Sequence, residues 1–312
     1  MFFVVISYVS LIGISSPYNY QNDDYVLKNC YFFELSSASS GAAICFLSSD
    51  RSIVVESSVF SKCTTHGSAG AIYVPYSCSV SLSKVCGYKC WARDYYCFSY
   101  ITCGSYISES NLVSISSCPD RLYIDGYTLY YSTYFCGGQF DHSYMNSSFN
   151  EVGEFSIARI NDVSQGNMGY CTFAHTYAQT CTAILYFYSK IHTTMTNFVN
   201  NTQNGVKYGG TLLCYSSPCY LTFSKTNFIR NHHILFSISS GWVLLQSCSS
   251  DINCITSYIT ISSITNSSIT HKIDHLNTNE CGIGDSYVKS HQMNNISSFI
   301  VLFSLLSMLS IQ

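Results

Sequence analysis

The sequence predicts an all-β fold, a right-handed parallel β-helix of about eight or nine coils with a repeat of roughly 27–30 residues. Two observations lead to this prediction: the chain is rich in residues that favour strands, and short patterns recur along it at a nearly constant spacing. Stretches rich in Ala, Leu, Glu and Lys are almost absent, so helix bundles and dinucleotide-binding α/β folds are not expected.

The composition fits a folded chain of strands. Hydrophobic residues make up 47% of the 312 residues and charged residues 10%, which is too apolar for a disordered chain. The 27 Tyr and 19 Phe often alternate with Ser and Thr, as in strands with one buried face. The formal net charge is -3 and Lys and Arg total 14, so nucleic acid is not an expected partner.

The chain has 17 cysteines, which favours an oxidising compartment. The count is odd, so at least one cysteine stays unpaired or pairs between chains. Zinc is the competing explanation, but no CxxC pair occurs, and the closest spacings are Cys86 to Cys90, Cys97 to Cys103 and Cys214 to Cys219. We therefore expect disulfides and buried thiols, and no metal or other cofactor.

The strongest internal repeat is a pair of hexapeptides 30 positions apart, Thr196–Asn201 and Thr226–Asn231, both of the form T-N-F-aliphatic-x-N. Ser58–Cys63 is a third copy, in which cysteine replaces the last asparagine. In a parallel β-helix such residues stack on their equivalents at the strand spacing of about 4.8 Å. The expected ladder has inward aromatic residues at Phe60, Phe198 and Phe228, and interior turn residues at Cys63, Asn201 and Asn231.

A glycine follows each of these aromatic residues by ten to thirteen positions and precedes an aliphatic strand. The expected glycine ladder consists of Gly41, Gly70, Gly210 and Gly241, because glycine permits the backbone geometry of a corner. By this pitch the coils run from about Val26 to about Thr265, with the poorest match at Leu122–Gln179. A β-sandwich is the alternative fold, but it has no reason to keep a spacing of 30.

Apolar segments at the two ends of the chain predict that the protein is located outside the cell. Residues 1–16 resemble a signal peptide, with a first buried strand as the alternative. The β-helix domain then occupies residues 17–265, and residues 266–298 form a polar linker. Residues 299–312 form a hydrophobic tail, expected to be a lipid-anchor signal or a short membrane anchor, which makes the membrane an expected partner. Four sequons, at Asn146, Asn200, Asn266 and Asn295, are possible glycosylation sites.

The pairing of a Gly-Ala-Ile step with Phe-x-x-Asn resembles the repeat of polymorphic outer membrane proteins. Ser40–Ile44, Ala69–Ile72 and Gly209–Leu212 are similar to its first half, and Phe198–Asn201 and Phe228–Asn231 match the second. The chain departs from the family because the double glycine is mostly single, Cys63 replaces an asparagine, and no outer-membrane barrel follows. The resemblance implies a surface protein with an adhesive role.

Candidate catalytic residues are few. Many β-helix enzymes act on polysaccharides and need two or three carboxylates on one face. Asp120 and Asp125 form the single compact acidic group, and an exposed ion pair with Arg121 is its simpler explanation. His232-His233 and the pair His271 and His275 match no complete metal motif.

Two hypotheses about function follow. The first is a non-enzymatic, membrane-anchored adhesion scaffold whose flank binds glycans or surface proteins. The alternative is a β-helix polysaccharide lyase or glycoside hydrolase, which would require a groove with at least two carboxylates within about 10 Å. Convergence of Asp120, Asp125, Asp141 and Glu151 on one face would favour it.

Overall fold

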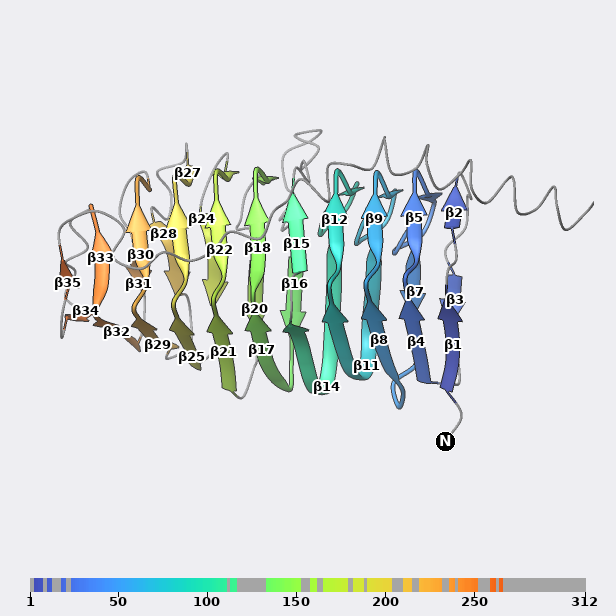
Figure 1. Cartoon of the computed structure of the whole chain (residues 1–312), viewed down its shortest axis with the longest axis horizontal. Coiled ribbons are helices and arrows are strands. Elements are labelled where there is room, and N and C mark those ends of the chain that lie inside the picture. The colour runs from blue at the N-terminus through green and yellow to red at the C-terminus, as the bar shows by residue number, and fades with distance from the viewer. Residues whose placement is uncertain are drawn as a thin grey trace, which may run out of the picture.

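The computed structural model describes residues 3–7, 10–12, 18–20, 24–110, 113–116, 133–152, 158–161, 165–178, 182–187, 190–203, 210–214, 219–231, 236–238, 241–251, 259–261 and 264–265. Every regular element among them is a strand, and the strand pairs are parallel and stacked as a β-solenoid (Figure 1). The predicted all-β parallel solenoid is therefore confirmed, whereas its handedness and number of coils stay predictions. Within these ranges, no helix has the length and apolarity that crossing a membrane requires.

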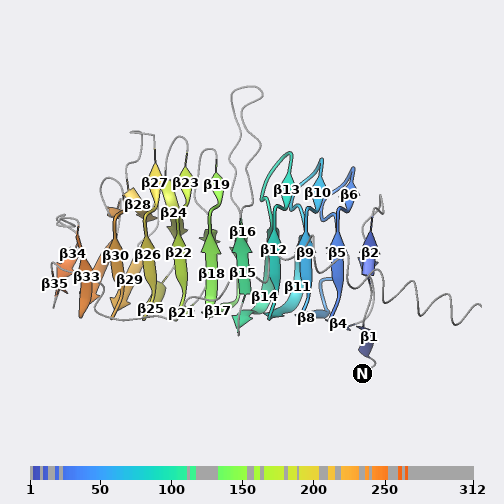
Figure 2. The ribbon, with the colours of Figure 1, turned by 45° about the horizontal axis from the view of Figure 1, so that its top comes forward.

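Each coil passes along three main walls, which Figures 1 and 2 show from two directions. The first wall contains β1 (Phe3–Ser7), β4 (Asp24–Lys28), β8 (Ser52–Glu56), β17 (Gln139–Ser143), β21 (Gln165–Gly169), β25 (Lys190–Thr194), β29 (Cys219–Ser224), β32 (Gly241–Gln246) and β34 (Ile259–Ile261). The second wall is an 11-stranded sheet of β2 (Ser10–Ile12), β5 (Tyr31–Phe33), β9 (Val59–Ser61), β12 (Cys86–Tyr88), β15 (Val113–Ser116), β18 (Met145–Ser148), β22 (Thr172–Ala174), β26 (Asn197–Val199), β30 (Asn227–Ile229), β33 (Cys248–Ser250) and β35 (Ile264–Thr265).

The third wall contains β3 (Tyr18–Tyr20), β7 (Ile44–Phe46), β16 (Thr133–Cys136), β20 (Ala158–Asn161), β24 (Thr182–Phe187), β28 (Gly210–Cys214) and β31 (Phe236–Ile238). Two long strands, β11 (Ile72–Ser83) and β14 (Ser99–Ser110), run through the third and first walls and join them into one 18-stranded sheet. Short strands lie between the second and third walls: β6 (Ser36–Ser37), β10 (Thr64–Thr65), β13 (Trp91–Ala92), β19 (Glu151–Val152), β23 (Tyr177–Ala178) and β27 (Thr202–Gln203).

The second wall carries the predicted aromatic ladder. Phe32 pairs with Phe60, and Phe173, Phe198 and Phe228 pair in succession. The rings of Phe198 and Phe228 lie 5.2 Å apart with planes 5° from parallel, and both side chains are fully buried. The fold prediction required these two phenylalanines to overlie one another, and they do.

The coils vary more in length than the predicted repeat. Partners in this column are 32 residues apart between Ile115 and Ser147 and 22 apart between Phe228 and Ser250. The strands stay in register despite this variation, because the stacked side chains set the register within each wall.

The corner before the second wall begins with a left-handed residue, and in most coils the next residue is small and polar or a cysteine. Asn29, for example, has φ 54°, and Cys30 directs its thiol to the carbonyl oxygen of Lys28 at 3.4 Å. Hydroxyl groups replace the thiol in other coils: Ser58 bonds the Glu56 carbonyl at 2.9 Å. A left-handed conformation costs a non-glycine residue about 1 kcal/mol or more, and in the coils where Cys, Ser or Thr comes next, the bond from that side chain stabilises the corner.

The corner after the second wall is the predicted interior turn. Asn201 and Asn231 are buried there, and the Asn201 amide donates to Asn231 Oδ1 at 2.9 Å. Cys63 occupies the equivalent position three residues after Phe60 and directs its thiol to the carbonyl oxygen of Phe32 at 3.7 Å. Asparagine and cysteine can alternate at this turn because each is small and offers a donor to a buried carbonyl.

The glycines do not form the single column that the sequence predicted. Ile44 pairs with Ile72, which places Gly41 level with Ala69 and Gly70 one position later. Gly41 and Ala69 both have positive φ, of 71° and 62°. The corner therefore tolerates alanine at its left-handed position, which is why the glycine pattern is a poor guide to register.

Gly210 and Gly241 lie on different walls. Gly210 pairs with Thr182 on the third wall, whereas Gly241 pairs with Cys219 on the first. The coil after Phe228 is short, so β31 supplies its third wall and Gly241 already begins the next coil. Equal spacing from the aromatic residue therefore did not mean an equivalent position.

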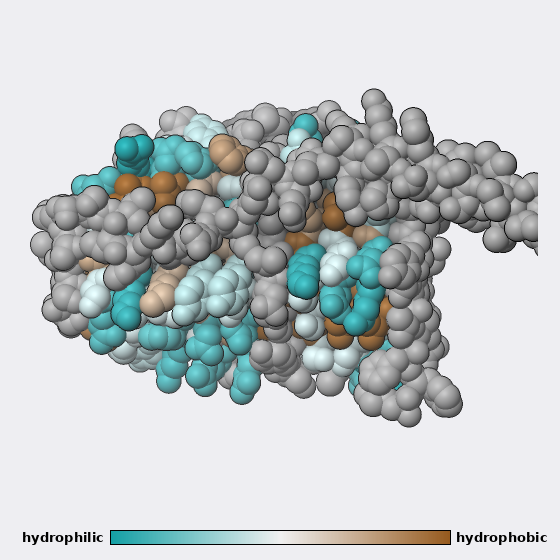
Figure 3. Space-filling model, viewed as in Figure 1, coloured by the Kyte–Doolittle hydropathy of each residue, from teal (hydrophilic) through white to brown (hydrophobic). Residues whose placement is uncertain are grey.

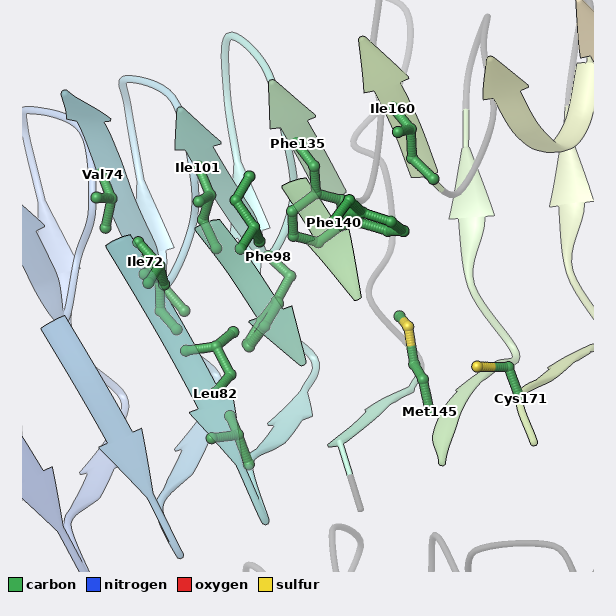
Figure 4. Close-up of a cluster of buried hydrophobic side chains, with 14 of the residues drawn as sticks. Ile72, Val74, Leu82, Phe98, Ile101, Phe135, Phe140, Met145, Ile160 and Cys171 are labelled. Atoms are coloured by element: carbon green, nitrogen blue, oxygen red, sulfur yellow. The ribbon is translucent and has the colours of Figure 1, made fainter. Parts of the chain in front are cut away.

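The core fills the space between the walls, as Figure 4 shows for the middle coils. Gly87 stands where the aromatic column would place a phenylalanine. A Cβ atom at Gly87 would overlap the ring of Phe98, which enters from the opposite wall. The ring centres of Phe98 and Phe60 are 6.0 Å apart. The glycine therefore makes room for an aromatic ring that another part of the coil supplies.

Several sequence predictions fall at the ends of the chain. Within residues 1–16, β1 pairs with β4 and β2 pairs with β5. The signal peptide and its alternative, a first buried strand, both stay predictions. Residues 133–178, which include most of the poorly matching middle segment, contribute strands to all three walls. The predicted linker and tail, residues 266–312, lie outside the described residues.

Candidate functional site

A hollow of about 470 Å³ lies on the outer face of the first wall. We call it the first-wall hollow, and it is lined by Gln165, Gly166, Asn167, Lys190, Ile191, His192, Tyr220, Thr222 and Trp242. It spans four successive strands, β21, β25, β29 and β32. Figure 3 shows hydrophilic side chains gathered at the lower left of the molecule, where Figure 1 places these strands.

Strand alternation determines which side chains reach the hollow. In β25, Ile191 is buried in the core, while Lys190 and His192 on either side of it are exposed. The same alternation holds in β32, where Val243 is buried and Trp242 is 41% exposed. Because the walls stack in register, the outward residues of successive coils form straight rows along the axis of the solenoid.

Two such rows pass through the hollow, and the second extends past the lining residues to Asp141. In the first, Lys190 pairs with Tyr220 and Tyr220 with Trp242. In the second, Asp141 pairs with Asn167, Asn167 with His192 and His192 with Thr222. One row therefore ends in aromatic rings, and the other presents carboxylate, amide, imidazole and hydroxyl groups.

The aromatic end is organised by direct contacts. The rings of Tyr220 and Trp242 are 5.5 Å apart and inclined by 57°, so the two faces form a bent platform. Lys190 Nζ lies 5.5 Å from the centre of the Tyr220 ring, which is within the range of a cation–π interaction. The cation is thereby held beside the platform.

This arrangement suits a ligand with both apolar and hydroxylated faces. Aromatic rings pack against the C–H face of a sugar, and the amide, hydroxyl and imidazole groups of the second row can exchange hydrogen bonds with its hydroxyl groups. The hollow is open and lies on rigid strands, so a chain-like ligand can extend along the rows past either end.

The acids named for the enzymatic alternative do not all share this face. Asp141 stands at one end of the second row on β17, whereas Glu151 belongs to β19, in a different sheet. Asp120 and Asp125 lie outside the described residues. No cluster of three His, Cys, Asp or Glu side chains able to hold a metal ion occurs within the described ranges.

The two described sequons differ sharply in accessibility. Asn146 is buried in β18, with 5% of its surface exposed, which disfavours a glycan there, and its glycosylation stays a prediction. Asn200 is exposed at the corner after β26, with Nδ2 2.8 Å from Nδ1 of His175. Asn266 and Asn295 lie outside the described residues.

The cysteines are mostly internal. Nine of those described are thiols, and eight of these are buried. Burial raises the pKa of the Cys63 thiol, as does the adjacent Cys90 thiol of the next coil. Cys86 is disulfide-bonded, so the chain combines buried thiols with disulfide chemistry.

The residues of the first-wall hollow were not singled out from the sequence. A signal was present, because the 30-residue spacing of the twin hexapeptides also separates Lys190 from Tyr220 and His192 from Thr222. Placing the two coils one above the other at this spacing would have put Tyr220 beside Lys190. Trp242 could not be placed in this way, since its coil is shorter than the others.

No family model, no curated protein and no solved structure matches the chain.

Proposed function

We propose that this protein is a non-enzymatic adhesion scaffold, displayed outside the cell, that binds glycans in the first-wall hollow. The observation that carries the proposal is the meeting of an aromatic platform, Tyr220 and Trp242, with a row of polar side chains on one outward face. Ligand sites commonly combine apolar walls with a few oriented polar groups in this way.

The architecture supports a binding role. Strands hold the side chains of the hollow at fixed spacing, so little order has to be gained when a ligand binds. The rows also run along the solenoid, which allows several units of a linear ligand to make similar contacts on successive coils.

The location of the protein outside the cell is the second part of the proposal. It rests on the 17 cysteines, the apolar segments at residues 1–16 and 299–312 and the exposed sequon at Asn200. The resemblance to the polymorphic outer membrane protein repeat supports a surface role. Fractionation of tagged protein with and without residues 299–312 tests this part, and equal recovery of both forms in the cytosol would overturn it.

Binding is tested with the full chain on an array of surface and cell-wall glycans, followed by titration calorimetry with the glycans retained. We expect Trp242→Ala to abolish most of the binding, because it removes the exposed face of the platform. Tyr177→Ala is the matched control, since Tyr177 is an exposed aromatic residue (37%) away from the hollow. Thermal unfolding of each variant confirms that the fold is retained.

The outcomes separate the proposal from the enzymatic alternative. Binding lost in Trp242→Ala and kept in Tyr177→Ala supports the scaffold. Release of shortened glycan by the wild type, abolished by Asp141→Asn, would replace it with a polysaccharide-cleaving enzyme. An array without any retained glycan would reject the hollow as a glycan site.

A further inference from the structure

A cluster of tyrosine rings lies on the outer side of the third wall, away from the first-wall hollow. Tyr73 and Tyr100 pair in register between β11 and β14, and their ring centres are 5.3 Å apart with planes inclined by 26°. Tyr96 lies at the corner before β14, and its ring centre is 4.9 Å from that of Tyr100 and 5.9 Å from that of Tyr95. We call these four residues the tyrosine cluster.

The fold forces these rings to the surface. Ile72 and Val74 are fully buried on either side of Tyr73, so alternation turns Tyr73 outward. Tyr100 follows in the next coil beside the buried Ile101. Tyr95 is 42% exposed, so an oxidant in solution reaches the edge of the cluster directly.

We propose that the tyrosine cluster is a site of oxidative cross-linking, in which Tyr100 couples to Tyr73 or Tyr96 to form dityrosine. A haem peroxidase with hydrogen peroxide is the oxidant. Each phenol loses one electron and one proton, and the two radicals join through ring carbons ortho to the oxygens. The two ortho hydrogens leave those carbons and restore the phenol O–H groups as the rings regain aromaticity. One peroxide is reduced to two waters for each new C–C bond.

Proximity is the reason for choosing these tyrosines. Two radicals couple fast when their rings are already in contact, because the encounter is intramolecular. Burial, together with the adjacent Tyr100, raises the pKa of Tyr73, so this phenol carries no charge beside the Tyr100 ring. Tyr100 is the central member, since it touches both Tyr73 and Tyr96.

A second pair has the same geometry and is included in the proposal. Tyr144 and Tyr170 stack at 4.9 Å with planes 7° from parallel, and they are 43% and 42% exposed. They occupy the corner before the second wall in consecutive coils, where both residues have positive φ. Tyr177 provides the contrast, because it is 37% exposed and contacts no other aromatic ring of the described residues.

The test treats the folded full chain, at low protein concentration, with a haem peroxidase and hydrogen peroxide. Monomer is isolated by gel electrophoresis, digested and examined by mass spectrometry and by dityrosine fluorescence. We expect cross-linked peptides joining Tyr100 to Tyr73 or Tyr96, and Tyr144 to Tyr170. Each should weigh two hydrogens less than the sum of its two parts.

The variant Tyr100→Phe keeps the ring and its packing but has no phenol to oxidise. It should remove the first cross-link and leave the Tyr144–Tyr170 product, which serves as an internal control for the reaction. Tyr177→Phe should change neither product. Dityrosine found solely in dimers, equal yield of the first cross-link from protein unfolded in urea, or a first product that survives in Tyr100→Phe would each overturn the proposal.

Discussion

Replacing Asn201 with alanine should destabilise the second corner of its coil, because the Asn201 side chain is fully buried and joins three coils. Its amide donates to the carbonyl oxygen of Phe173 and to Oδ1 of Asn231, both at 2.9 Å. Its Oδ1 accepts the backbone N–H of Thr176 at 3.1 Å. One amide thus links the coil before, its own coil and the coil after.

The magnitude follows from the groups that lose these partners. Asn231 Oδ1 loses the bond from the Asn201 amide but still accepts the backbone N–H of residue 201 at 3.2 Å. This oxygen therefore loses one of two donors. The Thr176 N–H and the Phe173 carbonyl both lose the Asn201 side chain, and a buried polar group without its partner costs about 1–3 kcal/mol. We therefore expect Asn201→Ala to lower the free energy of unfolding by about 2–5 kcal/mol.

Two measurements check this expectation. Urea unfolding followed by circular dichroism gives the global change, and hydrogen exchange gives the local one, at the amide of Thr176. Asn167→Ser, on the exposed face of β21, is the control and should change the stability by less than about 0.5 kcal/mol. A loss below about 0.5 kcal/mol in Asn201→Ala, with unchanged exchange at Thr176, would refute the reasoning.

Three further predictions concern the core. Phe228→Ala should lower the free energy of unfolding, measured with urea, by about 3–5 kcal/mol, because it removes a fully buried ring from the aromatic column. Gly87→Ala should cost about 1–3 kcal/mol, because the new methyl group overlaps the ring of Phe98; Gly104→Ala, which has open space around it, is the control. Burial lowers the pKa of His142 well below its usual value, so the unfolded chain takes up a proton before the folded one, and stability should fall by about 1.4 kcal/mol per pH unit below about pH 6.5.

Each of these has an outcome that contradicts it. A Phe228→Ala loss under about 0.5 kcal/mol would place the ring outside the core. Equal effects of Gly87→Ala and Gly104→Ala would show that the Phe98 ring gives way without cost. For His142 the measurement is the urea midpoint between about pH 7 and about pH 5.5, above the range in which carboxylates titrate. The same slope in His142→Leu would mean that another group is responsible.

The aromatic ladder could be predicted from sequence because its signal is direct. Phe198 and Phe228 stand in nearly identical hexapeptides, and stacking demands the same residue type at the same depth. Other rungs of the column are not aromatic, such as Gly87 and Ser147. At Gly87 the ring comes from Phe98 on the opposite wall, and such compensation across the core leaves no pattern along the chain.

The first-wall hollow was harder to predict because it depends on how separate coils align. Lys190, Tyr220 and Trp242 are ordinary residues in their own strands, and they become a site when the register places them in one row. The coil length between the last two differs from the average repeat, so fixed spacing would have misplaced Trp242. Glycine spacing failed for the same reason at Gly241.

The two twelve-residue strands β11 and β14 have a mechanical consequence. In most coils the third and first walls are formed by two separate strands. Here two neighbouring strands continue from one wall into the other, although their pairing shifts register between Val74 and Ser79. Force applied to either end of the solenoid should therefore unfold the outer coils first. Unfolding should stop at the β11–β14 pair, which would leave residues 72–110 folded.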